Sequence, residues 1–127
     1  MNSQEYKKLA IKTEANDFKG IKERLDDEGM LRILHGAMGL NTEAGEFMDA
    51  LKKHVFYNKP IDRSNLFEEL GDIFWYMALI CDELDFDFET IMQKNIAKLK
   101  VRYGHKFSSE KAENRNLKDE RDAFEVH

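Results

Sequence analysis

Cysteine and long apolar segments are scarce in this sequence of 127 residues, and basic residues are fewer than acidic ones. Cys81 is the single cysteine, so the chain cannot form an intrachain disulfide. The longest uninterrupted apolar run, Ile73–Cys81, has nine residues, whereas a transmembrane helix needs about 20. The first residues lack the basic and apolar regions of a signal peptide. These absences predict a cytoplasmic protein that does not associate with membranes.

The acidic excess narrows the range of partners. Lysine and arginine number 20 against 25 aspartates and glutamates, which gives a net charge of −5 at pH 7. Such a chain is a poor non-specific ligand for nucleic acid polymers and for acidic lipid surfaces. A nucleotide substrate is still compatible with this charge, because a bound metal ion can bridge acidic ligands and phosphates.

Proline is also rare, with one residue in the chain, and no segment has the pattern of a strand. Apolar residues recur at helical spacing instead, which predicts an all-α fold of about four helices. The expected helices cover residues 3–15, 30–57, 62–84 and 88–103, and the third begins at Asp62 or Ser64. The turn around Pro60 folds the second and third helices into an antiparallel hairpin, and Gly104 ends the last helix.

The predicted domain spans residues 1–104, and residues 105–127 form a charged C-terminal tail. Hydrophobic residues make up 42% of the chain, which indicates a globular protein of one domain. Two interpretations of the tail stay open: a frayed, solvated segment, or an arm that docks on a neighbouring subunit through Leu117 and Phe124. The region around Gly20 and residues 26–29 is expected to be loose connecting chain.

Two short acidic motifs carry the clearest functional signal. Each is a pair of carboxylates three residues apart, with a glycine between them, inside a strongly apolar helical pattern. The four residues are Glu43, Glu46, Glu69 and Asp72. Residues three apart share a helix face, so the hairpin gathers four negative charges, which repel one another unless a cation lies among them. All-oxygen ligands suit a hard cation, so we expect Mg2+, with Mn2+ as an alternative.

Glycines accompany both motifs. Gly45 and Gly71 each lie inside an expected helix, where glycine costs about 1 kcal/mol relative to alanine. We therefore expect close helix packing or ligand access at these two positions.

Other residues offer contacts for a phosphorylated ligand. Asn95, Lys98 and Arg102 share a face of the fourth helix and can hold phosphate oxygens, although a solvated basic stripe has the same pattern. Trp75 can stack on a nucleobase or pack in the core. His35 can reach a substrate or serve as a packed or surface side chain. These five are the candidate substrate-binding residues.

Three segments resemble the signatures of MazG-type nucleotide pyrophosphohydrolases, which belong to the all-α NTP pyrophosphatase superfamily. They are Leu40–Ala50 (LNTEAGEFMDA), Glu68–Tyr76 (EELGDIFWY) and Asn95–Tyr103 (NIAKLKVRY). The resemblance covers roughly residues 30–103, in the right order and spacing. It implies a MazG-like helical bundle that cleaves nucleoside triphosphates between the α and β phosphates, giving NMP or dNMP and pyrophosphate.

The resemblance also implies roles for individual residues. The four carboxylates would bind the metal ion, and Lys98 and Arg102 would hold the phosphates, with Asn95 assisting. Where some relatives have a lysine before the second motif, this chain has Asn65 nearby. One carboxylate can accept a proton from the attacking water, and we assign that role to Glu46.

Two other functions fit parts of the pattern. A ferritin-like di-iron bundle would use Glu-x-x-His pairs, but no histidine here has a glutamate three positions before it. The residues three positions before the four histidines are Arg32, Leu51, Arg102 and Phe124. A non-enzymatic helical interaction module is the second alternative, and divalent-metal binding distinguishes it from the enzyme.

The chain has more apolar side chains, Phe74 among them, than a domain of this size can bury. This excess predicts a homodimer or homotetramer, in which a second copy covers the remaining apolar surface.

Overall fold

The computed structural model describes residues 1–125. Over these residues the chain is helical and contains no strand, so the all-α prediction is confirmed. The elements are α1 (Ser3–Ala10), η1 (Ile11–Thr13, a 3-10 turn), α2 (Phe18–Leu25), α3 (Glu28–Tyr57), α4 (Arg63–Leu84), α5 (Phe88–Tyr103), α6 (Ser109–Glu113) and α7 (Leu117–Phe124). Residues 126 and 127, the last two of the predicted tail, lie outside the described range. Within that range, no helix combines the length and the apolar character that crossing a membrane requires.

The chain divides into two compact units, one formed by residues 1–80 and one that begins at Cys81. The first unit contains α1, α2, α3 and most of α4, and the second contains the end of α4 with α5, α6 and α7. The domain boundary expected at Gly104 stays a prediction. Gly104 does end α5 as expected: its φ is +67° and its N–H donates to the carbonyl of Lys100 at 2.8 Å.

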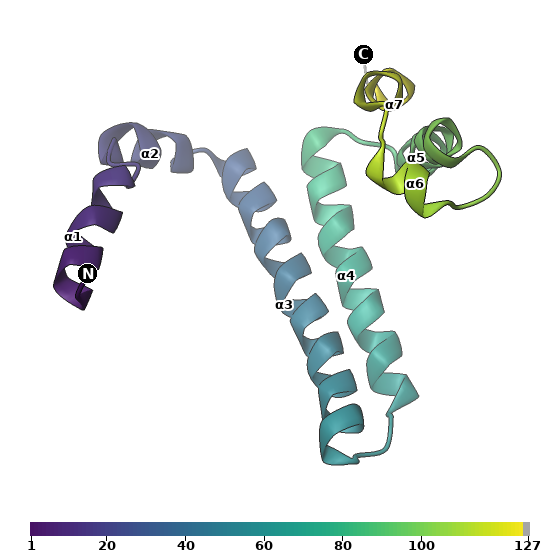
Figure 1. Ribbon diagram of the computed structural model, residues 1–127, viewed down its shortest axis with the longest axis horizontal. Helices are drawn as coiled ribbons and strands as arrows, with labels where there is room; N and C mark the ends of the chain where they lie inside the picture. The colour runs from purple at the N-terminus through teal and green to yellow at the C-terminus, as the bar shows by residue number, and fades with distance from the viewer. Residues whose placement is uncertain (126–127) are drawn as a thin grey trace. The chain divides into compact units, whose positions relative to one another are not determined.

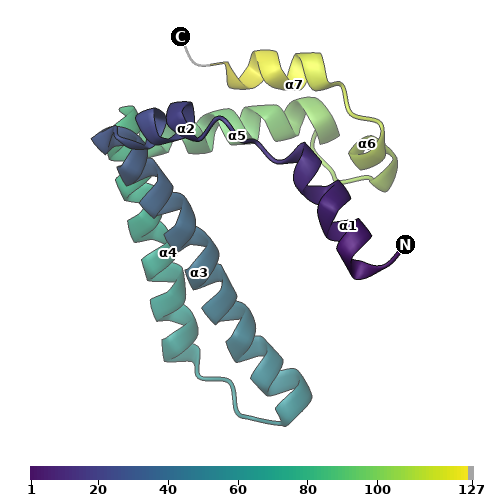
Figure 2. The same ribbon diagram turned by 90° about the vertical axis from the view of Figure 1, so that its left-hand side faces the viewer.

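An antiparallel hairpin of α3 and α4 dominates the first unit (Figures 1 and 2). Asp27 caps the start of α3 by accepting a hydrogen bond from the N–H of Met30 at 2.7 Å. Asn58 ends α3 in the left-handed conformation with φ of 51°, before Pro60 is reached. Asp62, one of the two predicted residues, caps α4 by accepting from the N–H of Asn65 at 3.1 Å. The backbone conformation of Asn58 and the cap at Asp62 therefore fix the two ends of the hairpin turn.

Two glycines of α3 allow α4 to approach closely. A Cβ atom at Gly36 would lie 2.5 Å from Cγ1 of Ile80 and 3.2 Å from the carbonyl oxygen of Tyr76. A Cβ atom at Gly39 would overlap the ring of Tyr76. Both glycines are buried. Any larger residue at these positions would force the helices apart, so these glycines set the spacing of the hairpin.

The hairpin leaves much of its apolar surface uncovered. Phe67 is 80% exposed and Phe74 is 62% exposed, and both belong to α4. Among residues 1–125, Cys81 is the one hydrophobic residue that is buried. Large exposed apolar areas are typical of surfaces that contact another molecule.

Two segments that the sequence did not predict as helical form helices. In place of loose chain around Gly20, α2 begins at Phe18, because the carboxylate of Asp17 caps it by accepting from the N–H of Gly20 at 3.2 Å. In the tail, Ser108 caps α6 and Asn116 caps α7.

The expectation of a frayed tail is therefore wrong over the described residues. α7 lies along α5 of its own chain (Figure 2). The other interpretation, an arm that docks on a neighbouring subunit, stays a prediction.

Candidate functional site

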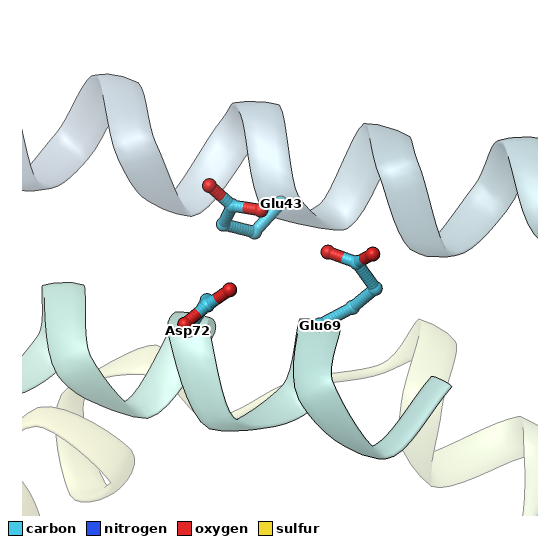
Figure 3. Close-up of side chains that lie close together, drawn as sticks. All are labelled: Glu43, Glu69 and Asp72. Carbon is cyan, nitrogen blue, oxygen red and sulfur yellow. The ribbon is translucent and has the colours of Figure 1, made fainter. Parts of the chain in front are cut away.

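Three carboxylates from the two hairpin helices converge on one point (Figure 3). Glu43 comes from α3, and Glu69 and Asp72 lie one turn apart on α4. Each offers a carboxylate oxygen, and these oxygens all lie within 4.8 Å of one another. Two oxygens on opposite sides of a Mg2+ ion would be about 4.2 Å apart, at about 2.1 Å from the ion. Small side-chain rotations would therefore let the three residues hold such an ion.

Glu69 is the fixed member of this cluster. Its side chain is 7% exposed, and its Oε1 accepts a hydrogen bond from Nδ2 of Asn65 at 2.7 Å. Asn65 lies four residues earlier on α4, so the two side chains meet on one helix face. The sequence analysis gave Asn65 no such role, although the spacing of four was a readable signal. Because the amide already holds this carboxylate in place, the side chain loses less conformational freedom when it binds a metal ion.

The cluster is electrostatically unfavourable without a cation. Partial burial raises the pKa of Glu43 above its ordinary value, and the charge of Glu46 raises it further. A hydrogen bond with Glu69 and the charge of Asp72 act in the same direction. A divalent cation would remove this penalty, and carboxylate oxygens are the ligands that Mg2+ and Mn2+ prefer.

Glu46, the fourth predicted metal ligand, is exposed and stands outside the group of three. It lines a cavity of about 370 Å3 near the hairpin turn, together with Glu69. Asp49 on the cavity wall forms ion pairs with Lys53 at 2.6 Å and Lys52 at 2.9 Å, which lower its pKa to about 2. The cavity therefore combines the exposed carboxylate of Glu46 with an ion-paired cluster at Asp49, which has a net charge of +1 because two lysines face one carboxylate, next to the three converging carboxylates.

The two glycines inside the acidic motifs do not contact the opposing helix. A Cβ atom at Gly45 or Gly71 would meet no atom of the described chain within 4 Å outside its own helical turn. Close packing within this chain therefore does not explain them, and this part of the prediction is wrong. Space for a ligand or for another molecule is the explanation that stays open.

The aromatic candidates gather around Tyr76, one turn beyond Asp72. The His35 and Tyr76 rings meet edge-on, with centroids 5.7 Å apart. Trp75 meets Tyr76 at 5.0 Å in the same manner. Trp75 is nevertheless 58% exposed, so its ring is accessible to a ligand and does not belong to a core.

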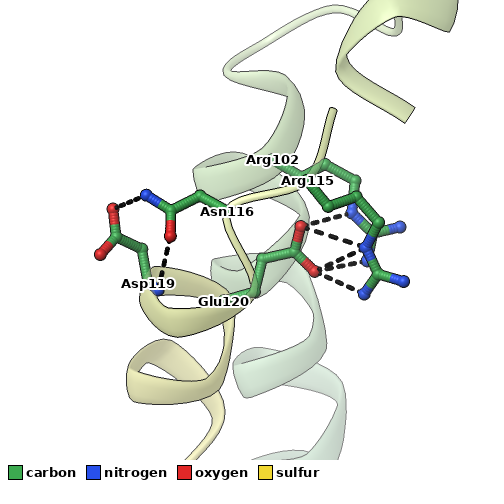
Figure 4. A network of polar contacts seen from close by, with 5 residues as sticks. All are labelled: Arg102, Arg115, Asn116, Asp119 and Glu120. Carbon is green, nitrogen blue, oxygen red and sulfur yellow. Dashed lines mark hydrogen bonds and ion pairs between the residues drawn. The ribbon is translucent and has the colours of Figure 1, made fainter. Parts of the chain in front are cut away.

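The predicted phosphate ligands belong to the second unit. The Nζ atom of Lys98 lies 5.4 Å from the ring centroid of Phe124, and Arg102 forms an ion pair with Glu120 of α7 (Figure 4). Asn95 is exposed on α5. A cavity of about 440 Å3 is lined by Lys98 and by two arginines of the tail. The sequence analysis placed the three α5 residues on one helix face but did not find their contacts with α7.

Comparison with known proteins relates the chain to a family and to a phage protein. Residues 35–107 match the family model of the MazG nucleotide pyrophosphohydrolase domain, a range that includes the carboxylate cluster and α5. The chain is also similar to the Gene 37 protein of Mycobacterium phage L5, with 34% identity over 81 residues. That alignment covers 61% of this chain and 71% of the phage protein. No solved structure matches the chain.

Proposed function

Because this chain belongs to the MazG nucleotide pyrophosphohydrolase family, we propose that it hydrolyses nucleoside triphosphates. The bond broken is the anhydride between the α and β phosphates, and the products are NMP or dNMP and pyrophosphate. The observation that carries the proposal is the convergence of Glu43, Glu69 and Asp72, with oxygens within 4.8 Å of one another. Such a cluster has little reason to form on a helical hairpin unless it holds a cation, and a triphosphate requires one.

We assign this cluster to Mg2+, with Mn2+ as a substitute. When bound, the ion would neutralise phosphate charge and lower the pKa of a bound water. The buried carboxylate of Glu69, held by Asn65, supplies a ligand that is already oriented. Glu43 and Asp72 complete the set from either side of the hairpin.

The remaining predicted residues divide between the reacting atoms and the substrate. Glu46 lines the neighbouring cavity and is exposed, which suits a group that accepts the proton of the attacking water or adds a fourth metal ligand. Lys98 and Arg102 would stabilise the charge that develops on the pyrophosphate, assisted by Asn95. His35 and Trp75 would contact the nucleoside, and the exposure of Trp75 supports this assignment.

We further propose that the active form is a homodimer or homotetramer. The outward aromatic side chains of α4, among them Phe67 and Phe74, are exposed on the single chain. Pairing of hairpins from two copies would bury this surface, and closed symmetric assemblies are the usual result of such pairing.

The direct test is release of pyrophosphate from a panel of nucleoside triphosphates by the full chain, with Mg2+ and with a chelator. Asp72→Asn should abolish turnover and leave the fold intact, because Asp72 is exposed. Glu68→Gln is the matched control: it removes one exposed carboxylate from the same helix but not from the cluster. Release of orthophosphate with a diphosphate product would contradict the assigned reaction.

A helical interaction module is the competing function. It would show neither turnover nor a metal-dependent rise in Tm, because its acidic residues would only face water. A rise in Tm with Mg2+ that Asp72→Asn removes and Glu68→Gln retains would exclude it.

A further inference from the structure

Glu120 makes an unusually well-defined contact with Arg102. Its Oε1 accepts from Nε of Arg102 at 2.8 Å and its Oε2 accepts from Nη2 at 2.5 Å, so the pair is bidentate. The side chain of Glu120 is 3% exposed and that of Arg102 is 15% exposed. Exposed ion pairs are usually weak, but this carboxylate is almost entirely removed from water and is satisfied by hydrogen bonds.

A second arginine shares the same carboxylate (Figure 4). Nη2 of Arg115 donates to Oε2 of Glu120 at 2.7 Å. Two guanidinium groups face one carboxylate, so the cluster keeps a net charge of +1. The hydrogen bonds from Arg102 and then from Arg115 lower the pKa of Glu120 to about 2, so the carboxylate is ionised at neutral pH. The pair with Glu120 also raises the pKa of Arg102, which stays charged.

The bidentate contact uses one edge of the guanidinium group of Arg102. An arginine has five N–H donors, and the contact with Glu120 takes one from Nε and one from Nη2. The two donors on Nη1 do not take part in this pair. A free arginine would have to lose the rotational freedom of a long side chain when it binds an anion, whereas here the plane of the group is already fixed.

α7 and the residue that follows it make two further contacts with basic residues of α5. Lys94 donates from Nζ to the carbonyl oxygen of Glu125. Lys98 lies over the ring of Phe124. Positions 94, 98 and 102 are each four residues apart, so α7 contacts a single basic stripe of α5 along its length. The tail is therefore a structural support for this stripe.

We propose that Glu120 is a positioning residue for Arg102: it fixes one edge of the guanidinium group and leaves the Nη1 donors for a phosphate oxygen of the substrate. The inference rests on the proposed function, because it takes Arg102 as a phosphate ligand. It extends the functional part of the chain to α7, beyond residue 107, where the family match ends.

A double-mutant cycle on the full chain tests this role. Arg102→Ala should lower kcat/KM about 10- to 100-fold through loss of a charge-assisted phosphate contact. Glu120→Gln, with Arg102 intact, should lower kcat/KM about tenfold, and in the Arg102→Ala background it should change kcat/KM by less than about twofold. Asp122→Asn is the matched control, because it removes one exposed carboxylate from the same helix. It should leave kcat/KM and Tm near the parent values.

Calorimetric binding of inorganic pyrophosphate to the same four proteins (the parent, both single variants and the double variant) provides a readout without turnover. The same non-additive pattern is expected in the dissociation constants. If the parent binds pyrophosphate with this pattern but hydrolyses no nucleotide, the proposed reaction fails and the positioning role stands. If the parent is active but the two substitutions act additively, Glu120 only stabilises the fold and the inference fails. Higher activity in Glu120→Gln would also overturn it, because α7 would then restrain Arg102. Absence of both binding and hydrolysis in the parent would overturn both proposals.

Discussion

Replacing Gly39 with alanine should open the hairpin and weaken the metal cluster at the same time. The added methyl group would overlap three ring atoms of Tyr76, whose ring also contacts those of His35 and Trp75. Gly39 lies four residues before Glu43 on α3, and Tyr76 lies four residues after Asp72 on α4. The overlap is therefore one helical turn from the converging carboxylates, and any separation of the helices is transmitted to them.

The magnitude follows from two opposing contributions. Inserting a methyl group into a packed contact costs about 1–3 kcal/mol, and the overlap with three ring atoms within 2.3 Å favours the upper value. Alanine is a better helix former than glycine by about 1 kcal/mol. The net destabilisation is then about 2 kcal/mol, which for a chain of this length lowers Tm by about 8 °C.

Gly45→Ala is the matched control, because it is the same substitution in the same helix. A Cβ atom at Gly45 meets no atom of the described chain within 4 Å outside its own helical turn. The substitution should therefore only increase helix propensity, which stabilises the fold by about 1 kcal/mol and raises Tm by about 4 °C. The two variants of α3 should thus shift Tm in opposite directions.

The assay is thermal unfolding followed by circular dichroism, with and without Mg2+. Mg2+ should raise the Tm of the parent and of Gly45→Ala, because a ligand of the native state stabilises it. It should raise the Tm of Gly39→Ala less. A Gly39→Ala variant that melts at or above the parent temperature would refute the close approach of the helices at Tyr76. A lower Tm for Gly45→Ala would show that this glycine faces another molecule, such as a second copy of the chain.

Acid unfolding should depend on Glu120, whose stabilising effect is fully present above the ordinary pKa of 4.5 and is lost as the pH falls through about 2. In Glu120→Gln, the free energy of unfolding should therefore change less with pH between these two values. Glu43→Gln should raise the Tm of the metal-free protein at pH 7 and remove the rise caused by Mg2+, since it takes one charge out of the cluster. Lys98→Ala should lower kcat/KM about tenfold while the Mg2+-induced shift in Tm is unchanged, and an equal loss of that shift would contradict its role as a phosphate ligand. Phe74→Lys should give a smaller species than the parent in light scattering, and a parent that is an active monomer would contradict the proposed assembly.

The helices of the hairpin and α5 were predictable because their signals are local. Asp62 and Gly104, which the sequence marked as helix ends, act on backbone groups within a few residues, and the structure places a helix end beside each of them. Asp27 caps α3 where the sequence predicted loose chain. The acidic pairs were also predictable, because residues three apart on a helix share a face whatever the rest of the fold does. The antiparallel hairpin then brought Glu43 to Glu69 and Asp72, whereas Glu46, the fourth residue expected there, stands outside this group.

Predictions failed where long-range packing had to be known. The charged composition of the tail resembles that of a solvated segment, because its ionic partner, Arg102, lies 18 residues before Glu120 in the chain. Composition cannot distinguish a carboxylate that faces water from one that is buried between two arginines. In the same way, a glycine in a helix has the same sequence signal whether it contacts another helix, as Gly39 does, or open space, as Gly45 does.

The sequence by itself determined the helical class, the ends of the two hairpin helices and of α5 to within two residues, and the pairing of carboxylates within each motif, since these depend on interactions across a few residues. The tertiary structure alone decided which carboxylates of the two motifs meet, which glycines lie at the helix contact, and that Glu120 holds Arg102. The physical reason is distance along the chain. Contacts between residues far apart depend on how whole helices pack, and packing is set by the fit of many side chains at once.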